Sequence, residues 1–395
     1  MRKLSTTPGR GCRPGNVLVL FAVLLTSLIG MVAFAIDTGY IALYKTQMQR
    51  AADAAALAGA MKALVPPGEA QDPAAVRAEV RKYIELNMPG LTVRDEDVKL
   101  CRYTPYNEPG SRLSYSYSAA QQANAVQVTL HRDDVQNSPL KLFFAPVIGS
   151  KSAALATTST AYCAKGKSVK PGAPLLPYTM QIDYYYAAMG QPRPGGTGGG
   201  LLGSLLNTIK NLISDLFTVN PVTLLVSLGP DGINEVELFS DKPNAPGNFG
   251  SLDIGSNLNA TGELERQILY GPTEADFANP DFVFKVNPAD GALYVPFDGG
   301  GDSGMSTSVK TSFEAIRGQS RIIPLFDTRV GSGDTTVYHI AGYAGVVITK
   351  VDFSGNPKKI WVQPAFIVSN KVTPATSDTG TYSEGVYLPP KLVIP

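Results

Sequence analysis

The chain has 395 residues, enough for two or three domains that each bury a core of their own. Its 34 basic and 33 acidic residues leave a net charge of +1, so no overall field attracts polyanions, and we expect no nucleic-acid partner. With 39 glycines, 30 prolines and only 17% charged residues, the composition indicates a turn-rich, largely β exterior rather than a helical cytosolic enzyme.

An apolar run near the N-terminus predicts a transmembrane helix over residues 17–36. The run contains no charged residue, and its length matches a hydrocarbon core of about 30 Å at about 1.5 Å per residue. Four basic residues precede it, namely Arg2, Lys3, Arg10 and Arg13. Asp37 follows it, so the positive-inside rule predicts a cytoplasmic tail over residues 1–16 and export of everything beyond residue 37.

A cleaved signal peptide is the alternative for this run, because Ala33-Phe34-Ala35 has the small-x-small form of a cleavage site. The run is longer than the ~7–15 apolar residues of a typical signal peptide, and the helical pattern continues beyond Ala35. Cleavage would cut a continuous helix, so the sequence favours an uncleaved anchor.

The helical pattern continues through residues 38–64, which contain no proline and are rich in alanine, and it stops at Pro66-Pro67. One helix over 17–64 would be roughly 70 Å long, so more than half would project beyond the membrane as a stalk. Small residues recur at every fourth position, which permits close approach of a partner helix. These candidate interface residues are Ala22, Thr26 and Gly30 in the membrane and Ala51, Ala55 and Gly59 outside it. The alternative is that alanine serves helix propensity and the outer half packs on the chain's own domain.

Three short sequence motifs lie along this predicted helix. They are Gly15-Asn16-Val17 at the start of the apolar run, Ala35-Ile36-Asp37-Thr38-Gly39 at its end, and QMQRAADAAALAGA over residues 47–60. In these motifs the chain resembles the N-terminal module of TadE/TadG-like proteins of the Flp, or tight-adherence, pilus system. The resemblance implies a structural or assembly component in the inner membrane of a bacterial cell, with most of the chain periplasmic or extracellular. Its implied partners are the lipid bilayer and other pilus-assembly membrane proteins. It implies no catalysis, no cofactor and no small-molecule substrate.

The chain departs from this family pattern at two places. Prepilin-like relatives that are cut after glycine carry Glu at the fifth position beyond the cut, whereas Leu20 stands fifth after Gly15. Longer relatives often carry an Asp-x-Ser-x-Ser metal loop, whereas the segment from Asp302 to Ser306 has Gly304 in place of the first serine. We therefore expect neither a major pilin nor a metal-dependent adhesion site. The alternative function is a stand-alone envelope or adhesive protein that shares only the anchor module.

Residues 37–165 are expected to combine the stalk helix with a small, pilin-like α+β unit. Asp72-Pro73 predicts the start of a short helix that ends near Asn87, and apolar alternation predicts a strand around residues 126–130. Residues 140–148 read as a short apolar helix and residues 153–163 as a second strand.

Cys101 and Cys163 both lie in this unit, on the side that the topology predicts to be oxidising. A disulfide between them would close a loop of about sixty residues and stabilise the unit by roughly 4 kcal/mol. The alternative to this disulfide is that both cysteines are buried as free thiols. Cys12 lies in the predicted cytoplasmic tail and should stay reduced.

Residues 166–200 read as a linker rich in proline and glycine, and residues 201–217 as an amphipathic helix that packs on its own domain or on a membrane or partner. Residues 218–395 are expected to form a mainly antiparallel β domain. Strands are predicted at 222–228, 234–239, 281–286, 292–296, 320–326, 336–350 and 359–369, the last two as a hairpin.

Catalytic signals are weak. Gly301-Asp302-Ser303-Gly304 resembles the loop around a serine-protease nucleophile, but only His131 and His339 could serve as a base, and neither has a matching context. The glycine-rich stretch 298–302 reads as a turn, and Asp298 with Asp302 provides too few ligands for a recognisable calcium loop. We expect no enzyme, with an exported serine hydrolase as the remote alternative.

Overall fold

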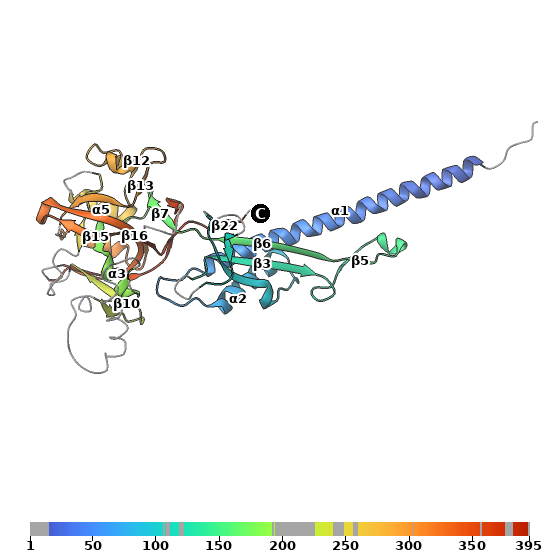
Figure 1. Ribbon diagram of the computed structural model, residues 1–395, viewed down its shortest axis with the longest axis horizontal. Coiled ribbons are helices and arrows are strands. Elements are labelled where there is room, and N and C mark those ends of the chain that lie inside the picture. Colours follow the sequence, from blue (N-terminus) through green and yellow to red (C-terminus); the bar gives the residue numbers. More distant parts are fainter. Residues whose placement is uncertain are drawn as a thin grey trace, which may run out of the picture.

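The computed structural model shows an α+β protein with one long N-terminal helix and mainly antiparallel sheets (Figure 1). It describes residues 16–105, 107, 111–117, 122–191, 193, 226–239, 249–255, 260–302, 304–355, 358–375 and 382–393. The predicted tail up to residue 15, the predicted amphipathic helix at 201–217 and Ser303 lie outside these residues.

The continuous helix predicted from the sequence is confirmed: α1 runs from Asn16–Lys62 over 47 residues. Because the segment contains no proline, the backbone hydrogen bonds of the helix continue without interruption, and Pro66-Pro67 follows shortly after the helix ends. Residues 17–32 are exposed, whereas most of the second half from Met48 onward is buried or half-buried against the rest of the chain.

The second half of α1 packs on one face of a five-stranded antiparallel sheet, together with α2 (Pro73–Asn87). In spatial order the strands are β2 (Leu113–Ser114), β1 (Val98–Tyr103), β3 (Ala125–Arg132), β6 (Leu155–Tyr162) and β22 (Lys391–Leu392). The short 3-10 helix η1 (Asp95–Asp97) precedes β1. α2 begins as predicted, because the Asp72 carboxylate accepts the amides of Ala74 and Ala75 at 2.9 and 3.2 Å. We call this body the helix-packed unit.

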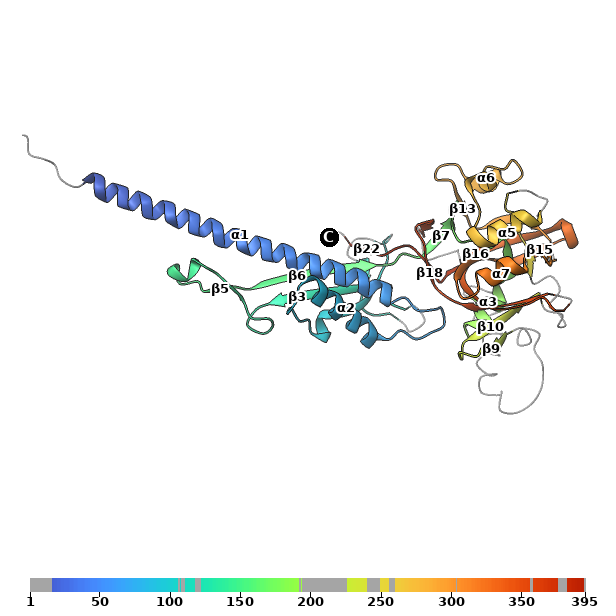
Figure 2. The same cartoon turned by 180° about the vertical axis from the view of Figure 1, so that it is seen from behind.

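A narrow arm extends from β3 and β6 along α1 (Figures 1 and 2). It contains the short ladder β4 (Leu140–Lys141) with β5 (Ser152–Ala153), and its tip holds the 3-10 helix η3 (Ala145–Ile148). The apolar helix predicted over 140–148 is therefore too long. Leu140 pairs with Ala153 in the ladder, so only the last four residues are free to turn.

The described residues between 166 and 388 form a second body, which we call the distal unit, around a nine-stranded sheet. Along the main path its strands are β11 (Phe249–Ser251), β8 (Tyr178–Gln181), β15 (Ser320–Val330), β16 (Thr336–Asp352), β17 (Lys359–Pro364), β10 (Asn234–Leu238) and β9 (Val226–Leu228). β14 (Phe297–Gly301) and β20 (Tyr382–Glu384) also pair with β16. The predicted hairpin is confirmed by the antiparallel pairing of β16 with β17.

Smaller elements complete the distal unit. A four-stranded sheet contains β12 (Val286–Asn287), β13 (Ala292–Tyr294), β7 (Gly166–Val169) and β19 (Val372–Pro374), and β18 (Ile367–Val368) pairs with β21 (Val386–Tyr387). The helices are α3 (Ile182–Ala188), α5 (Thr261–Tyr270), α6 (Glu274–Phe277), η4 (Val283–Lys285), α7 (Lys310–Ala315) and η5 (Gly333–Thr335).

Three segments differ from their sequence-based expectation. Part of the expected linker, residues 166–188, forms β7, β8 and α3, with Tyr178 and Tyr185 in the core. The expected turn at 298–302 is largely strand β14, whose glycines allow close backbone approach: a Cβ on Gly301 would collide with the carbonyl oxygen of Ser251. In the expected strand at 281–286, residues 283–285 form the 3-10 helix η4 and only Val286 lies in a strand.

The chain returns to the helix-packed unit at its C-terminal end, where Lys391 and Leu392 pair with Tyr162 and Ala161 of β6. The helix-packed unit is therefore made from both ends of the chain, which the predicted boundaries 37–165 and 218–395 did not include. Figure 2 shows the free half of α1 and the distal unit at opposite ends of the long axis.

Candidate membrane-anchoring and assembly site

The first half of α1 is exposed and apolar. Among the described residues it is the one helix long and apolar enough to cross a membrane, with a mean hydropathy of 2.8 over its most apolar window. The hydroxyls of Thr26 and Ser27 donate to carbonyl oxygens one turn back, at 3.0 Å to Ala22 and 2.8 Å to Val23. These bonds satisfy the polar groups inside the helix itself, which suits an apolar solvent.

The predicted small-residue stripe divides into two parts. Ala22, Thr26 and Gly30 are exposed, and a Cβ built on Gly30 would have no neighbour within 4 Å. The described residues of the chain therefore leave this part of the stripe exposed.

The outer part, Ala51, Ala55 and Gly59, is buried inside the helix-packed unit. A Cβ on Gly59 would lie 2.8 Å from Cγ2 of Val80 in α2 and 3.1 Å from Cγ1 of Val126 in β3. The outer residues therefore permit close approach, but to the chain's own elements, and they do not face an external partner. This corrects the expectation of a partner interface there and matches the alternative of packing on the chain's own domain.

Polar residues of the alanine-rich segment also bind within the chain. The amide of Gln49 donates to the Asp53 carboxylate at 2.7 Å, and the hydroxyl of Thr157 in β6 donates to the Gln49 side-chain oxygen. Through Gln49, the half-buried Asp53 is therefore linked by hydrogen bonds to the sheet.

Asp37, the first residue after the predicted membrane segment, binds the tip of the arm. Its carboxylate accepts the backbone amides of Phe143, Phe144 and Ala145 at 2.9, 3.0 and 2.6 Å, and the residue is only 5% exposed. Three amide donors compensate a carboxylate for the water that burial removes. In the sequence, Asp37 marks the end of the apolar run and belongs to the Ala35–Gly39 motif, neither of which predicts this contact. A charged residue directly after an apolar run is a sequence signal for a functional position. It does not show that the amides of residues 143–145 are its hydrogen-bond donors.

Aromatic contacts support the same attachment. The ring of Tyr40 lies 5.0 Å from that of Phe143, and the Arg132 guanidinium lies 4.4 Å from the ring centre of Tyr44. The arm is therefore held to α1 by groups that extend over about two turns of the helix beyond residue 36.

Both described cysteines are free and buried, so the structure has the second of the two alternatives expected for them. Strand β3 lies between β1, which holds Cys101, and β6, which Cys163 follows. Two strand spacings amount to about 9–10 Å, beyond the roughly 7 Å that a disulfide spans between Cα atoms. The side chains also lie on opposite faces, since Cys163 packs with α1 and Cys101 packs with Tyr103 and Ala125. Burial raises the pKa of each thiol to about 12.

The two histidines lie in different bodies. His131 is in β3, 3.6 Å from carboxylate oxygens of Asp97 and Asp133. His339 is in β16, where its Nδ1 lies 2.7 Å from Asp298, its register partner in β14. Within the described part of the chain, no group of three or more His, Cys, Asp or Glu side chains is placed to hold a metal ion.

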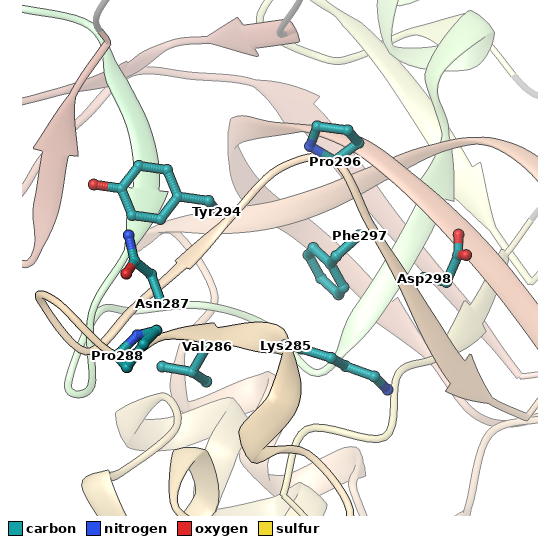
Figure 3. Close-up of a pocket in the computed structure, with 8 residues that line it drawn as sticks. All are labelled: Lys285, Val286, Asn287, Pro288, Tyr294, Pro296, Phe297 and Asp298. Atoms are coloured by element: carbon teal, nitrogen blue, oxygen red, sulfur yellow. The ribbon is translucent and has the colours of Figure 1, made fainter.

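The distal unit has an open pocket of about 540 Å³ beside β12 and β13 (Figure 3). Its lining residues are Lys285, Val286, Asn287, Pro288, Tyr294, Pro296, Phe297 and Asp298. Burial lowers the pKa of Lys285, although the nearby carboxylates of Asp253 and Asp298 oppose this shift. The polar groups are engaged within the fold: Tyr294 donates to Asp290 at 2.7 Å, and Asp298 pairs with His339. The lining does not present a nucleophile aligned with a base.

These features define a class of protein in which one long helix provides both an exposed apolar segment and the spine of a folded α+β unit. Residues 15–62 match the family described as putative Flp pilus-assembly TadE/G-like, and residues 42–161 match putative Tad-like Flp pilus-assembly. These matches confirm the resemblance to TadE/TadG-like pilus-assembly proteins that the sequence motifs predicted for the N-terminal part of the chain. The chain matches no curated protein and no solved structure. The family domains support a pilus-assembly component with a structural role.

Proposed function

We propose that the chain is a membrane-anchored structural or assembly component of a Tad-type pilus or a related surface secretion apparatus. In this proposal residues 17–36 cross the inner membrane, the basic tail stays in the cytoplasm, and both folded bodies lie outside. The observation that carries the proposal is the continuity of α1, because one unbroken helix joins the exposed apolar segment to the core of the family domain.

The geometry supports a spacer role. About 25 residues of α1 follow Asp37, and at about 1.5 Å per residue they extend roughly 38 Å. The helix-packed unit is built around this segment, and the distal unit lies beyond it (Figure 1). The chain would thus hold the distal unit well away from the bilayer surface, where it could contact other envelope or pilus components.

The membrane segment would supply the contact with other pilus-assembly membrane proteins. Without a hydrophobic driving force between helices in lipid, small residues favour association because they let backbones approach closely. Ala22, Thr26 and Gly30 are exposed and unoccupied by the chain's own side chains, so we assign them to this interface.

Protease accessibility tests the topology. Protease added to spheroplasts should digest the distal unit and leave a membrane-bound N-terminal fragment, whereas it should not reach a tag on the N-terminus until the membrane is lysed. A mature protein that begins at Ile36, or a tag digested before lysis, would overturn the anchor or its orientation.

A stand-alone envelope or adhesive protein is the second candidate function. One observation favours it: the two family matches end at residues 62 and 161, and neither covers the distal unit. Deletion of the gene in a piliated cell separates the two candidates. Loss of surface pili, restored by the wild-type chain, supports assembly, whereas normal piliation with altered adhesion supports the second candidate.

A further inference from the structure

The tip of the arm presents apolar side chains to solvent. Phe143, Phe144 and Val147 are 64%, 42% and 88% exposed. Single exposed apolar residues are ordinary on protein surfaces, but three within five residues at the end of one projection form a patch. The turn itself explains the backbone conformation and not the choice of phenylalanine and valine.

The position of this patch along α1 is fixed. Asp37 accepts the amides of residues 143–145, and the apolar run of α1 ends one residue before it. If residues 17–36 fill the hydrocarbon core, the tip therefore lies at the level where that core ends. Figure 2 shows the arm along α1, with the turn beyond β5 directed toward the free half of the helix.

Two lysines flank the patch. Lys141 in β4 and Lys151 immediately before β5 are both exposed, and they stand on the two sides of the same short ladder. Apolar side chains between exposed lysines suit a lipid interface, where the apolar groups enter the acyl boundary and the ammonium groups reach phosphate oxygens.

We infer that residues 142–149 form a second membrane contact, in which Phe143, Phe144 and Val147 enter the interface of the bilayer that α1 crosses. The inference rests on the proposed anchoring. Two contacts restrict the orientation of the helix-packed unit more than a single helix does, because rotation about the axis of α1 would lift the tip out of the lipid. Asp37 is the positioning residue of this contact.

The test uses the full chain in vesicles of phosphatidylcholine and phosphatidylglycerol, with an environment-sensitive nitrobenzoxadiazole label at single introduced cysteines. Val147→Cys reports the tip, Leu24→Cys reports the anchor, and Val330→Cys, at a residue 76% exposed in the distal unit, reports water. All three carry Cys12→Ser, and the buried Cys101 and Cys163 are retained.

The label at residue 147 should emit at shorter wavelength than the label at 330 and should be quenched by lipids with a nitroxide near the headgroup. The label at residue 24 should be quenched by a nitroxide deep in the acyl chain. Adding Asp37→Asn should reduce quenching at 147 and leave quenching at 24 unchanged. Phe144→Cys is a second reporter of the tip, should the variant at 147 fold poorly.

Three results would overturn the inference, and they differ in what else they affect. Emission at 147 like that at 330, with quenching at 24 intact, would remove the tip contact and leave the anchor. Absence of quenching at 24 would remove the anchor itself. A blue-shifted label at 147 that lipid nitroxides do not quench, but that crosslinks to protein, would assign the patch to a second copy or another protein.

Discussion

The carboxylate of Asp37 and the backbone amide of Ala145 are joined by a 2.6 Å hydrogen bond across 108 positions of sequence. This bond, with those to Phe143 and Phe144, connects the residue that ends the apolar segment to the far end of the β arm. The Asp37 side chain therefore fixes the tip of the arm against α1 at the end of the apolar segment.

We expect Asp37→Asn to loosen the tip of the arm without unfolding the unit. The neutral amide has one acceptor oxygen in place of two charged ones, so it cannot satisfy three donors equally well. Hydrogen exchange at the amides of residues 143–145 should accelerate by at least ~10-fold, while amides of β3 and β6 keep their protection. Asp134→Asn, at an exposed residue of the neighbouring loop, is the matched control and should change none of these rates.

Gly59→Leu should destabilise the helix-packed unit by about 1–3 kcal/mol or more, because overpacking forces Val80 and Val126 away from α1. Gly39→Leu is the same change in the same helix, at a residue where a Cβ meets nothing within 4 Å, and it should be close to neutral. Urea unfolding of the full chain in detergent measures the difference. Equal midpoints for the two variants would contradict the packing described for the outer half of α1.

Gly30→Leu should weaken association with other pilus-assembly membrane proteins and reduce surface piliation, while the chain stays folded and membrane-bound. The larger side chain would keep a partner helix from approaching the Ala22, Thr26 and Gly30 stripe. Ala35→Leu lies on another face of the same helix and should preserve both properties. Undiminished co-purification and piliation in the Gly30 variant would exclude this stripe as the interface.

The thiols of Cys101 and Cys163 should resist alkylation at neutral pH until the unit unfolds. Burial raises the pKa of each from 9.0 to about 12, so both stay protonated in the folded state. Mass spectrometry should find both residues unmodified after iodoacetamide treatment of the native chain and modified after treatment in denaturant. A peptide linked between the two cysteines under non-reducing conditions would contradict the free thiols.

The same shift predicts how stability depends on pH at the alkaline end. Because the folded state holds the thiol protons more tightly than the unfolded state, the contribution of these groups is fully present below pH 9. It should decline as pH rises from about 9 toward 12, and urea unfolding over that range measures the decline. Replacing both cysteines with alanine should reduce the slope.

The sequence by itself determined the features that depend on neighbouring residues. Local sequence features were sufficient to predict α1 and the family resemblance. They are the uncharged apolar run, the absence of proline from there to Pro66, and the alanine-rich motif over residues 47–60. Asp72 before Pro73 was sufficient for the start of α2, since a cap and its donors lie within one turn.

Only the tertiary structure decided which surfaces these elements share. The same small-residue spacing occurs at Ala22, Thr26 and Gly30 and again at Ala51, Ala55 and Gly59, and only burial distinguishes the exposed set from the set packed on α2 and β3. Three other features also depend on residues far apart in the sequence. They are the hydrogen bonds from the amides of residues 143–145 to Asp37, the position of β3 between the two cysteines, and the pairing of β22 with β6. Periodicity and capping report forces within a few residues, whereas these relations depend on how the whole sheet closes over the helix.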